Sequence, residues 1–98
     1  MNRPARIRVL GKQFSVVYGK DLPADLSGQC DSDKQRIDIW DCQPLESEQD
    51  TVLHEVLHAV DEAMGLKMRE AQIRGVATGL LAIMKDNASF VSYLRRRK

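Results

Sequence analysis

The sequence predicts a small α+β domain: an N-terminal antiparallel sheet of three to four strands, packed against a long helix, a second core helix and a short C-terminal helix. Two observations predict this class. Apolar and polar residues alternate over the first forty positions, the period of a half-buried strand. From residue 44 onward apolar residues recur every three to four positions, the period of an amphipathic helix. A chain of 98 residues has room for one such domain, 1–98, with one core.

The predicted sheet consists of two strand pairs. A first hairpin is expected over residues 7–18, where apolar side chains alternate about Gly11–Lys12. A second extended pair is expected over residues 28–31 and 35–40, with a turn at 32–34. The apolar positions that carry the alternation are Ile7, Val9, Phe14, Val16, Tyr18, Ile37 and Ile39.

The long helix is predicted to begin at Pro44 and to end before Gly65. Proline suits a first helical position, and the acidic residues that follow interact favourably with the helix dipole. A glycine in the left-handed conformation commonly ends a helix. The expected core-facing stripe is Leu53, Val56, Leu57, Val60 and Met64. The remaining arc then contains His54, Glu55, His58, Asp61 and Glu62.

Two further helices are predicted after Gly65. The second core helix is expected from Arg69 to Lys85, and Lys85-Asp86-Asn87 breaks it. Asn87 can cap a short last helix that ends at about Arg96. The expected buried stripe of the second helix is Ile73, Val76, Ala77, Leu80, Leu81 and Met84.

Composition excludes several classes of function. No apolar run approaches the ~18 residues of a spanning helix, and no hydrophobic signal core follows the basic N-terminus, so we expect no membrane association and a cytoplasmic location. Cys30 and Cys42 share no metal-binding spacing and are expected to be free thiols. A formal net charge of +1 gives no field that recruits nucleic acid, and the basic residues 95–98 complement the dipole of their helix.

Both histidines of the chain lie in one five-residue stretch, His54-Glu55-Val56-Leu57-His58, the H-E-x-x-H pattern of zinc enzymes. Positions four apart share one face of a helix, so both imidazoles can bind a single zinc ion. The intervening glutamate then reaches the zinc-bound water as a general base. Two histidines placed at random in this chain fall four apart in roughly 2% of placements, so chance explains the pattern poorly.

A catalytic zinc site needs a third protein ligand and one open position. Asp61 and Glu62 lie about 10–12 Å along the helix from His54, too far to share the ion easily. They fit a supporting role, in which a carboxylate orients a histidine ring through its free N–H.

The third ligand is expected from the segment that follows Gly65. Glu70 is favoured, because it shares the helical phase of the buried stripe, where a carboxylate is costly unless it is paired or binds a metal. It also suits a first-turn position for the helix dipole alone. Asp86 fits a cap more easily, and Cys30 or Cys42 stays open as a soft ligand.

With these residues in place, the whole chain resembles the small gluzincin-like proteins of phages and prophages, relatives of the ImmA/IrrE metallopeptidase family. The matching segments are the strand Gln35-Arg36-Ile37-Asp38-Ile39, the helical stretch 53–59, Glu70 at the start of the next helix, and Lys85-Asp86-Asn87. The resemblance implies a minimal metallopeptidase, a hydrolase that cleaves a peptide bond in an unknown protein substrate. It also implies that the sheet edge near Arg36–Trp40 aligns an extended peptide by strand addition.

The same resemblance implies His54, His58 and Glu70 as zinc ligands and Glu55 as the base. In the expected mechanism zinc lowers the pKa of its bound water towards ~7, and Glu55 takes the proton as the water attacks a peptide carbonyl. The developing oxyanion needs a further donor. Because no third histidine exists, Tyr93, Tyr18 or an arginine must serve, and Tyr93 is the candidate.

Two other classes of function compete with the peptidase. One is a zinc-bound regulatory or binding protein of phage type without useful hydrolysis, which the small size and the missing oxyanion histidine favour. The other is a nucleic-acid-associated module that uses the basic tail with Arg3, Arg6 and Arg8. Metal content separates the last class from the other two, and Glu55→Gln separates those two from each other. The sequence specifies neither the substrate nor the oligomeric state.

Overall fold

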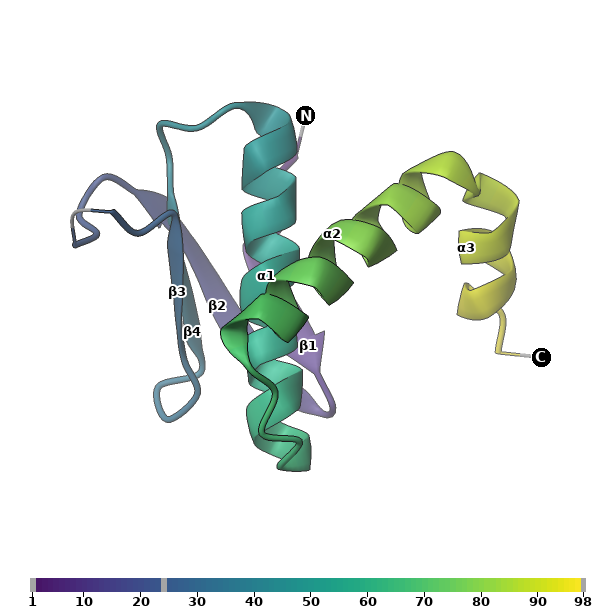
Figure 1. Ribbon diagram of the computed structural model, residues 1–98, viewed down its shortest axis with the longest axis horizontal. Helices are drawn as coiled ribbons and strands as arrows, with labels where there is room; N and C mark the ends of the chain where they lie inside the picture. Colours follow the sequence, from purple (N-terminus) through teal and green to yellow (C-terminus); the bar gives the residue numbers. More distant parts are fainter. Residues whose placement is uncertain (1, 24, 98) are drawn as a thin grey trace.

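The computed structural model describes residues 2–23 and 25–97, in which four strands precede three helices. This order confirms the predicted α+β class. Figure 1 shows the sheet beside α1, with α2 crossing α1 and then projecting away from it. The elements are β1 (Arg6–Val9), β2 (Lys12–Gly19), β3 (Gly28–Asp31), β4 (Arg36–Trp40), α1 (Leu45–Met64), α2 (Glu70–Asp86) and α3 (Ala88–Arg95).

The sheet is mixed, which corrects the expectation of an antiparallel one. Its strand order is β1-β2-β4-β3, and β2 pairs with β4 in parallel. Both predicted hairpins form as antiparallel pairs. The connection after β2 skips the position next to β2, so β3 forms at the edge of the sheet. The chain then turns back, and β4 occupies the position between β2 and β3. Strand Arg36–Trp40 is therefore paired on both sides, and the prediction that it is a free edge for substrate is wrong. The free edge on that side is β3.

The β1–β2 hairpin closes one residue earlier than predicted. Val9 pairs with Lys12, so the two turn residues are Leu10 and Gly11. Both have positive φ, 48° and 85°, as a two-residue turn that follows the strand twist requires. Leucine rarely adopts this conformation, which is why the sequence placed the turn at Gly11–Lys12.

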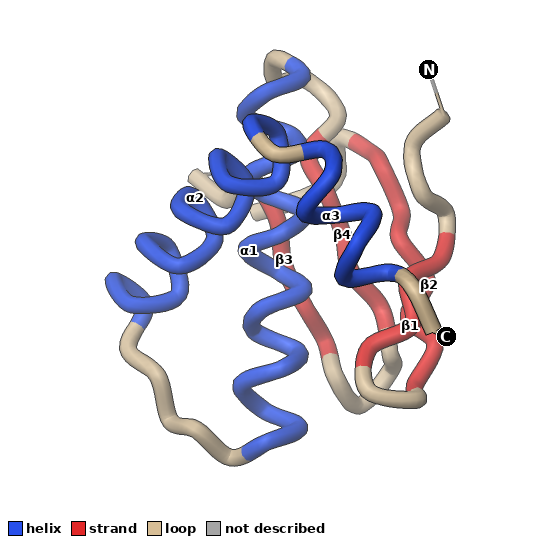
Figure 2. The backbone as a smooth tube through the Cα atoms, turned by 90° about the vertical axis from the view of Figure 1, so that its right-hand side faces the viewer, coloured by secondary structure: helices blue, strands red, loops and turns tan. Residues whose placement is uncertain are grey.

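The core lies between the sheet and α1. Helices lie on one side of the sheet (Figure 2), and α1 packs on β3, β4 and β1. Ile37 and Ile39 of the central strand β4 are fully buried, as the alternating pattern predicted. The buried core cluster is Val9, Phe14, Val16, Ile37, Ile39 and Ala59.

The face that α1 turns to the sheet differs from the predicted one. Glu55 is only 7% exposed and is buried, like Ala59, whereas we expected Glu55 off the core-facing arc. Gly28 of β3 makes this burial sterically feasible. A Cβ atom at Gly28 would lie 2.6 Å from Thr51 Cγ2 and 3.2 Å from Glu55 Oε2. The missing side chain in β3 thus provides the space that the glutamate occupies.

The predicted stripe of α2 is only partly buried. Ile73 and Ala77 are buried, but Val76, Leu80 and Met84 are exposed. The cause is the direction of α2, which leaves α1 after crossing it (Figure 1), so the later apolar positions are only partly covered by the rest of the described chain. Met64, expected in the stripe of α1, is likewise exposed at the end of that helix.

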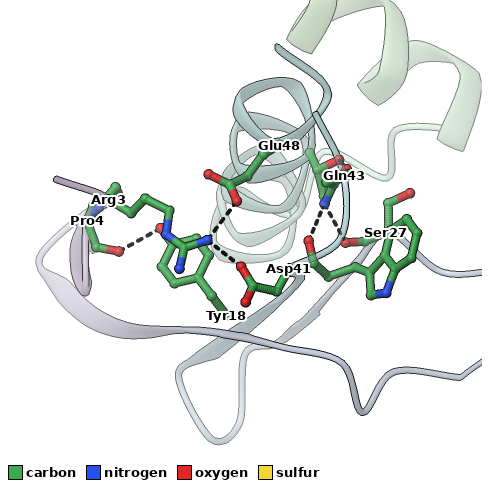
Figure 3. A network of polar contacts seen from close by, with 9 residues as sticks. Arg3, Pro4, Tyr18, Ser27, Asp41, Gln43 and Glu48 are labelled. Carbon is green, nitrogen blue, oxygen red and sulfur yellow. Dashed lines mark hydrogen bonds and ion pairs between the residues drawn. The ribbon is translucent and has the colours of Figure 1, made fainter. Parts of the chain in front are cut away.

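An arginine links the N-terminal segment to the start of α1 (Figure 3). Arg3 Nη1 donates to Asp41 Oδ1 at 2.6 Å and to Glu48 Oε1 at 2.9 Å. Its guanidinium carbon lies 4.1 Å from the centre of the Tyr18 ring, and the Tyr18 hydroxyl donates to the Pro4 carbonyl at 2.8 Å. Glu48 is buried, so the arginine supplies the partner that a buried carboxylate needs.

Among the described residues, no helix is both long and apolar enough to cross a bilayer.

The close approach of α1 to β3 predicts the effect of a single methyl group. Gly28→Ala should lower the free energy of unfolding by about 1–3 kcal/mol, because the new Cβ overlaps the stiff β-branched side chain of Thr51. Equilibrium unfolding in urea measures this change. Gly19→Ala is the matched control, since nothing lies within 4 Å of its added Cβ. Equal stability of the two variants would contradict the close packing.

Candidate metal centre

Two imidazoles converge on the face of α1 that meets the start of α2. His54 and His58 lie one helical turn apart, and their Nε2 atoms are 3.2 Å from each other. The i, i+4 spacing alone predicted this pairing, because such positions share one face of a helix. Neither side chain is fully exposed: 15% of the His54 side chain and 33% of the His58 side chain meet solvent.

The chain reverses after α1 and brings Glu70 to both histidines. Gly65 takes the left-handed conformation, with φ of 63°, and ends the helix. Glu70 then opens α2 with Oε1 2.5 Å from His54 Nε2 and Oε2 3.0 Å from His58 Nε2. The residue that the sequence favoured as third ligand thus contacts both imidazoles directly.

The donor atoms of these three side chains fit one metal ion. Within the described residues, His54, His58 and Glu70 form the one group of three metal-binding side chains, with ligand atoms within 4.8 Å of one another. Tetrahedral ligands about 2.0–2.1 Å from a zinc ion lie about 3.3 Å apart. The separations of His58 Nε2 from Glu70 Oε2 and from His54 Nε2, 3.0 and 3.2 Å, are close to this value, and the contact of Glu70 with His54 is shorter. Neither cysteine nor Asp86 belongs to this group, so the alternative ligands considered from sequence are not brought to it.

Glu55 lies beside the pair of imidazoles on the sheet side of α1. The pKa of its carboxyl is raised above the ordinary value, chiefly because the group is buried. The nearby His54 and His58 lower this pKa and Glu70 raises it, but burial has the largest effect. A carboxylate with a raised pKa accepts a proton more readily, which suits a general base. Because Gly28 of β3 lies against it, the Glu55 side chain has little freedom to turn away.

Asp61 and Glu62 do not take the supporting role that the sequence indicated. Asp61 Oδ1 accepts a hydrogen bond from the backbone N–H of Met68 at 3.0 Å, and neither carboxylate bonds a histidine ring among the described residues. Asp61 instead holds the loop that precedes Glu70, so it positions a ligand through the backbone. Glu62 is exposed.

A cavity of about 460 Å³ adjoins His58 and the C-terminal end of α1. Among the described residues that line this cavity, Lys67 is the one lysine or arginine. Lys67 was not predicted from the sequence as a site residue. Its backbone has a φ of 57°, unusual for lysine. No motif marks this residue; only its place between Gly65 and Glu70 could have indicated it. The cavity is lined by Cys30, His58, Asp61, Glu62, Gly65 and Lys67.

The predicted oxyanion donor is not brought to the cluster. Tyr93 lies on α3, beyond the far end of the 17-residue helix that Glu70 begins, which is about 25 Å long. Tyr93 is 62% exposed. The prediction of Tyr93 is therefore wrong, because it required the last helix to fold back over the histidines (Figure 1). Tyr18, the alternative, bonds Pro4 and lines a different cavity.

No protein-family model, curated protein or solved structure matches this chain. The resemblance to gluzincin-like phage proteins accordingly stays a prediction based on motifs.

The two cysteines should differ in reactivity. Both are free; Cys30 is half-buried in β3 and Cys42 is exposed. Burial raises the pKa of the Cys30 thiol to about 11, and only the thiolate reacts with alkylating reagents. Iodoacetamide at about pH 8 should therefore modify Cys42 at least about tenfold faster than Cys30, as followed by peptide mass spectrometry. Equal rates, or fewer than two thiols in the unfolded chain, would contradict this.

Proposed function

We propose that this chain is a zinc-dependent peptidase of the minimal gluzincin type, acting on a protein or peptide substrate. The observation that carries the proposal is the contact of one carboxylate, Glu70, with the Nε2 atoms of both His54 and His58, beside the buried Glu55. Two imidazoles and one carboxylate are the donor set of a class of catalytic zinc sites, which keep one further position open. When bound, zinc polarises a carbonyl and lowers the pKa of a water that it coordinates.

Glu55 performs the proton transfers in this proposal. Its carboxylate takes a proton from the attacking water as the new C–O bond forms at the peptide carbonyl. The same oxygen then gives that proton to the leaving amine nitrogen as the C–N bond breaks. Burial against β3 supports both steps, because it raises the basicity of the carboxylate and restricts its movement.

The edge strand β3 is the proposed guide for an extended substrate. No strand of the described residues lies on its outer side, so the backbone groups of β3 can pair there with a peptide by strand addition. β3 contributes Cys30 to the cavity beside His58, and Gly28 contacts Glu55 across the α1–β3 interface. Lys67, which lines that cavity, is the group we assign to the negative charge that develops on the carbonyl oxygen.

A zinc-stabilised binding protein of phage type is the second candidate. It is favoured by one observation: neither described tyrosine reaches the cluster, and both histidines of the chain belong to the cluster itself, so neither is left to stabilise an oxyanion. In this case Glu55 would have a structural role only.

We further infer a cytoplasmic location. Two free cysteines, one of them exposed, suit a compartment that keeps thiols reduced.

Metal content tests the ligand assignment. The purified chain should bind one zinc ion, His54→Ala should abolish binding, and Glu70→Ala should weaken it by more than about tenfold, because a ligand is lost. Elemental analysis and titration against a chelator measure these affinities. Glu62→Ala, a neighbouring carboxylate outside the cluster, is the control and should keep full affinity. Unchanged affinity in Glu70→Ala would refute the assignment.

Glu55→Gln distinguishes the two candidate functions. This change keeps the shape of the side chain and removes the base, so hydrolysis of fluorescence-quenched casein should fall by ~10²–10⁴, while zinc content stays the same. Glu46→Gln, at an exposed carboxylate in the first turn of α1, should retain wild-type activity. If the zinc-loaded wild-type chain cleaves no casein or quenched-peptide library, or if Glu55→Gln cleaves as fast as wild type, the peptidase proposal fails and the binding-protein alternative replaces it.

A further inference from the structure

The last part of the chain exposes an apolar face that no other described part of the chain covers. α3 contains no buried residue and packs only against α2 within the described chain. Phe90 and Leu94, four residues apart on one face of α3, are 46% and 61% exposed. An isolated helix of eight residues is marginal in water, so α3 needs a partner surface. We call the exposed face of α2 and α3 the C-terminal arm: Val76, Leu80, Ile83, Met84, Phe90, Tyr93 and Leu94.

The size of the exposed surface points to the kind of partner. A compact monomer of 11.1 kDa exposes about 5,700 Å² of surface, whereas this chain exposes 7291 Å². The excess, about 1,600 Å² per chain, would give about 3,200 Å² if two copies covered it on each other. That total lies within the range of obligate homodimers. The radius of gyration, 13.6 Å, also exceeds the about 12.6 Å expected for a compact chain of this length.

An apolar groove lies next to the arm. It has a volume of about 390 Å³ and runs between α1, the N-terminal segment and α2. Met84 belongs to both the groove and the arm, so the two form one continuous surface. The Oε1 atom of Gln49, which also lines the groove, is buried without a hydrogen-bond donor in the described residues. The apolar lining is largely Ile7, Leu45, Val52, Leu53, Val56 and Leu81.

We propose that the C-terminal arm is a dimerisation element, and that α3 of each copy lies in the groove of the other. A two-fold axis makes this exchange reciprocal, so both exposed faces of each chain become covered at once. Figure 1 shows α3 held away from α1 and the sheet by α2, the position from which an exchanged helix reaches a second molecule.

Charge sets the direction of α3 in the groove. The helix ends at Arg95 and is followed by Arg96 and Arg97, and the first turn of α1, beside the groove, contains the exposed Glu46. Opposite charges favour the orientation in which the C-terminus of α3 lies next to the N-terminus of α1. This orientation places Leu94 of one copy close to Leu45 of the other. Glu70 begins α2 and α3 follows its far end, so the metal-binding cluster stays open in the proposed dimer.

Sedimentation velocity between about 1 and 100 µM tests the proposal on the full chain. The wild type should sediment near twice 11.1 kDa. Phe90→Ala/Leu94→Ala should be monomeric, because it removes apolar area and keeps good helix formers. Leu45→Ala, on the groove wall, should raise the dissociation constant by at least about tenfold. Leu10→Ala, an equally exposed leucine in the β1–β2 turn, is the matched control and should remain dimeric.

Cross-linking tests the position of α3 in the groove directly, without a variant that fails to dimerise. In a Cys30→Ser/Cys42→Ser background, a mixture of Leu45→Cys chains and Leu94→Cys chains should form a disulfide between copies under mild oxidation. A monomeric wild type would overturn the proposal and leave the face to a different partner. A dimer that survives Phe90→Ala/Leu94→Ala would also overturn it. Full dimerisation of Leu45→Ala, together with no cross-link, would refute the placement of α3 in the groove.

Discussion

The contact of the Glu70 carboxylate with both His54 and His58 fixes where α2 meets α1. The two helices otherwise share few buried side chains, since only Ile73 and Ala77 of α2 are buried. An anion between two imidazoles is stable when a cation joins them or when the rings are protonated. In the proposed zinc-bound protein, the metal would therefore connect the helices as well as the ligands, and the loop held by Asp61 would set the position of the third ligand.

The sheet determines the other half of the site. β3 lies at the edge and carries a glycine at the point where α1 comes closest, so a glutamate can be buried against backbone. This packing gives Glu55 its raised pKa and its fixed direction. The same edge leaves backbone groups free beside the cavity at His58. The proposed base, the candidate metal-binding cluster and the proposed substrate edge thus depend on one tightly packed contact between α1 and β3.

Local patterns predicted most of this structure, and long-range geometry accounts for what they missed. Each strand and helix follows from periodicity and end signals, and the H-E-x-x-H spacing with the phase of Glu70 indicated the cluster. The parallel pairing of β2 and β4 could not be read locally, because the path between two hairpins leaves no periodic signal. The burial of Glu55 depends on a glycine about 27 residues away. Tyr93 was misplaced because the direction of α2 is set by packing at its first turns.

The most direct test of the central claim is X-ray absorption spectroscopy at the zinc edge of the metal-loaded chain. The account predicts a first shell of nitrogen and oxygen atoms at about 2.0–2.1 Å, with the outer-shell scattering of two imidazoles and no sulfur. A sulfur atom at about 2.3 Å would implicate Cys30 or Cys42 as a ligand. A shell with fewer than two imidazoles would rule out His54, His58 and Glu70 as the ligand set. Either result would contradict the assignment on which the proposed chemistry rests.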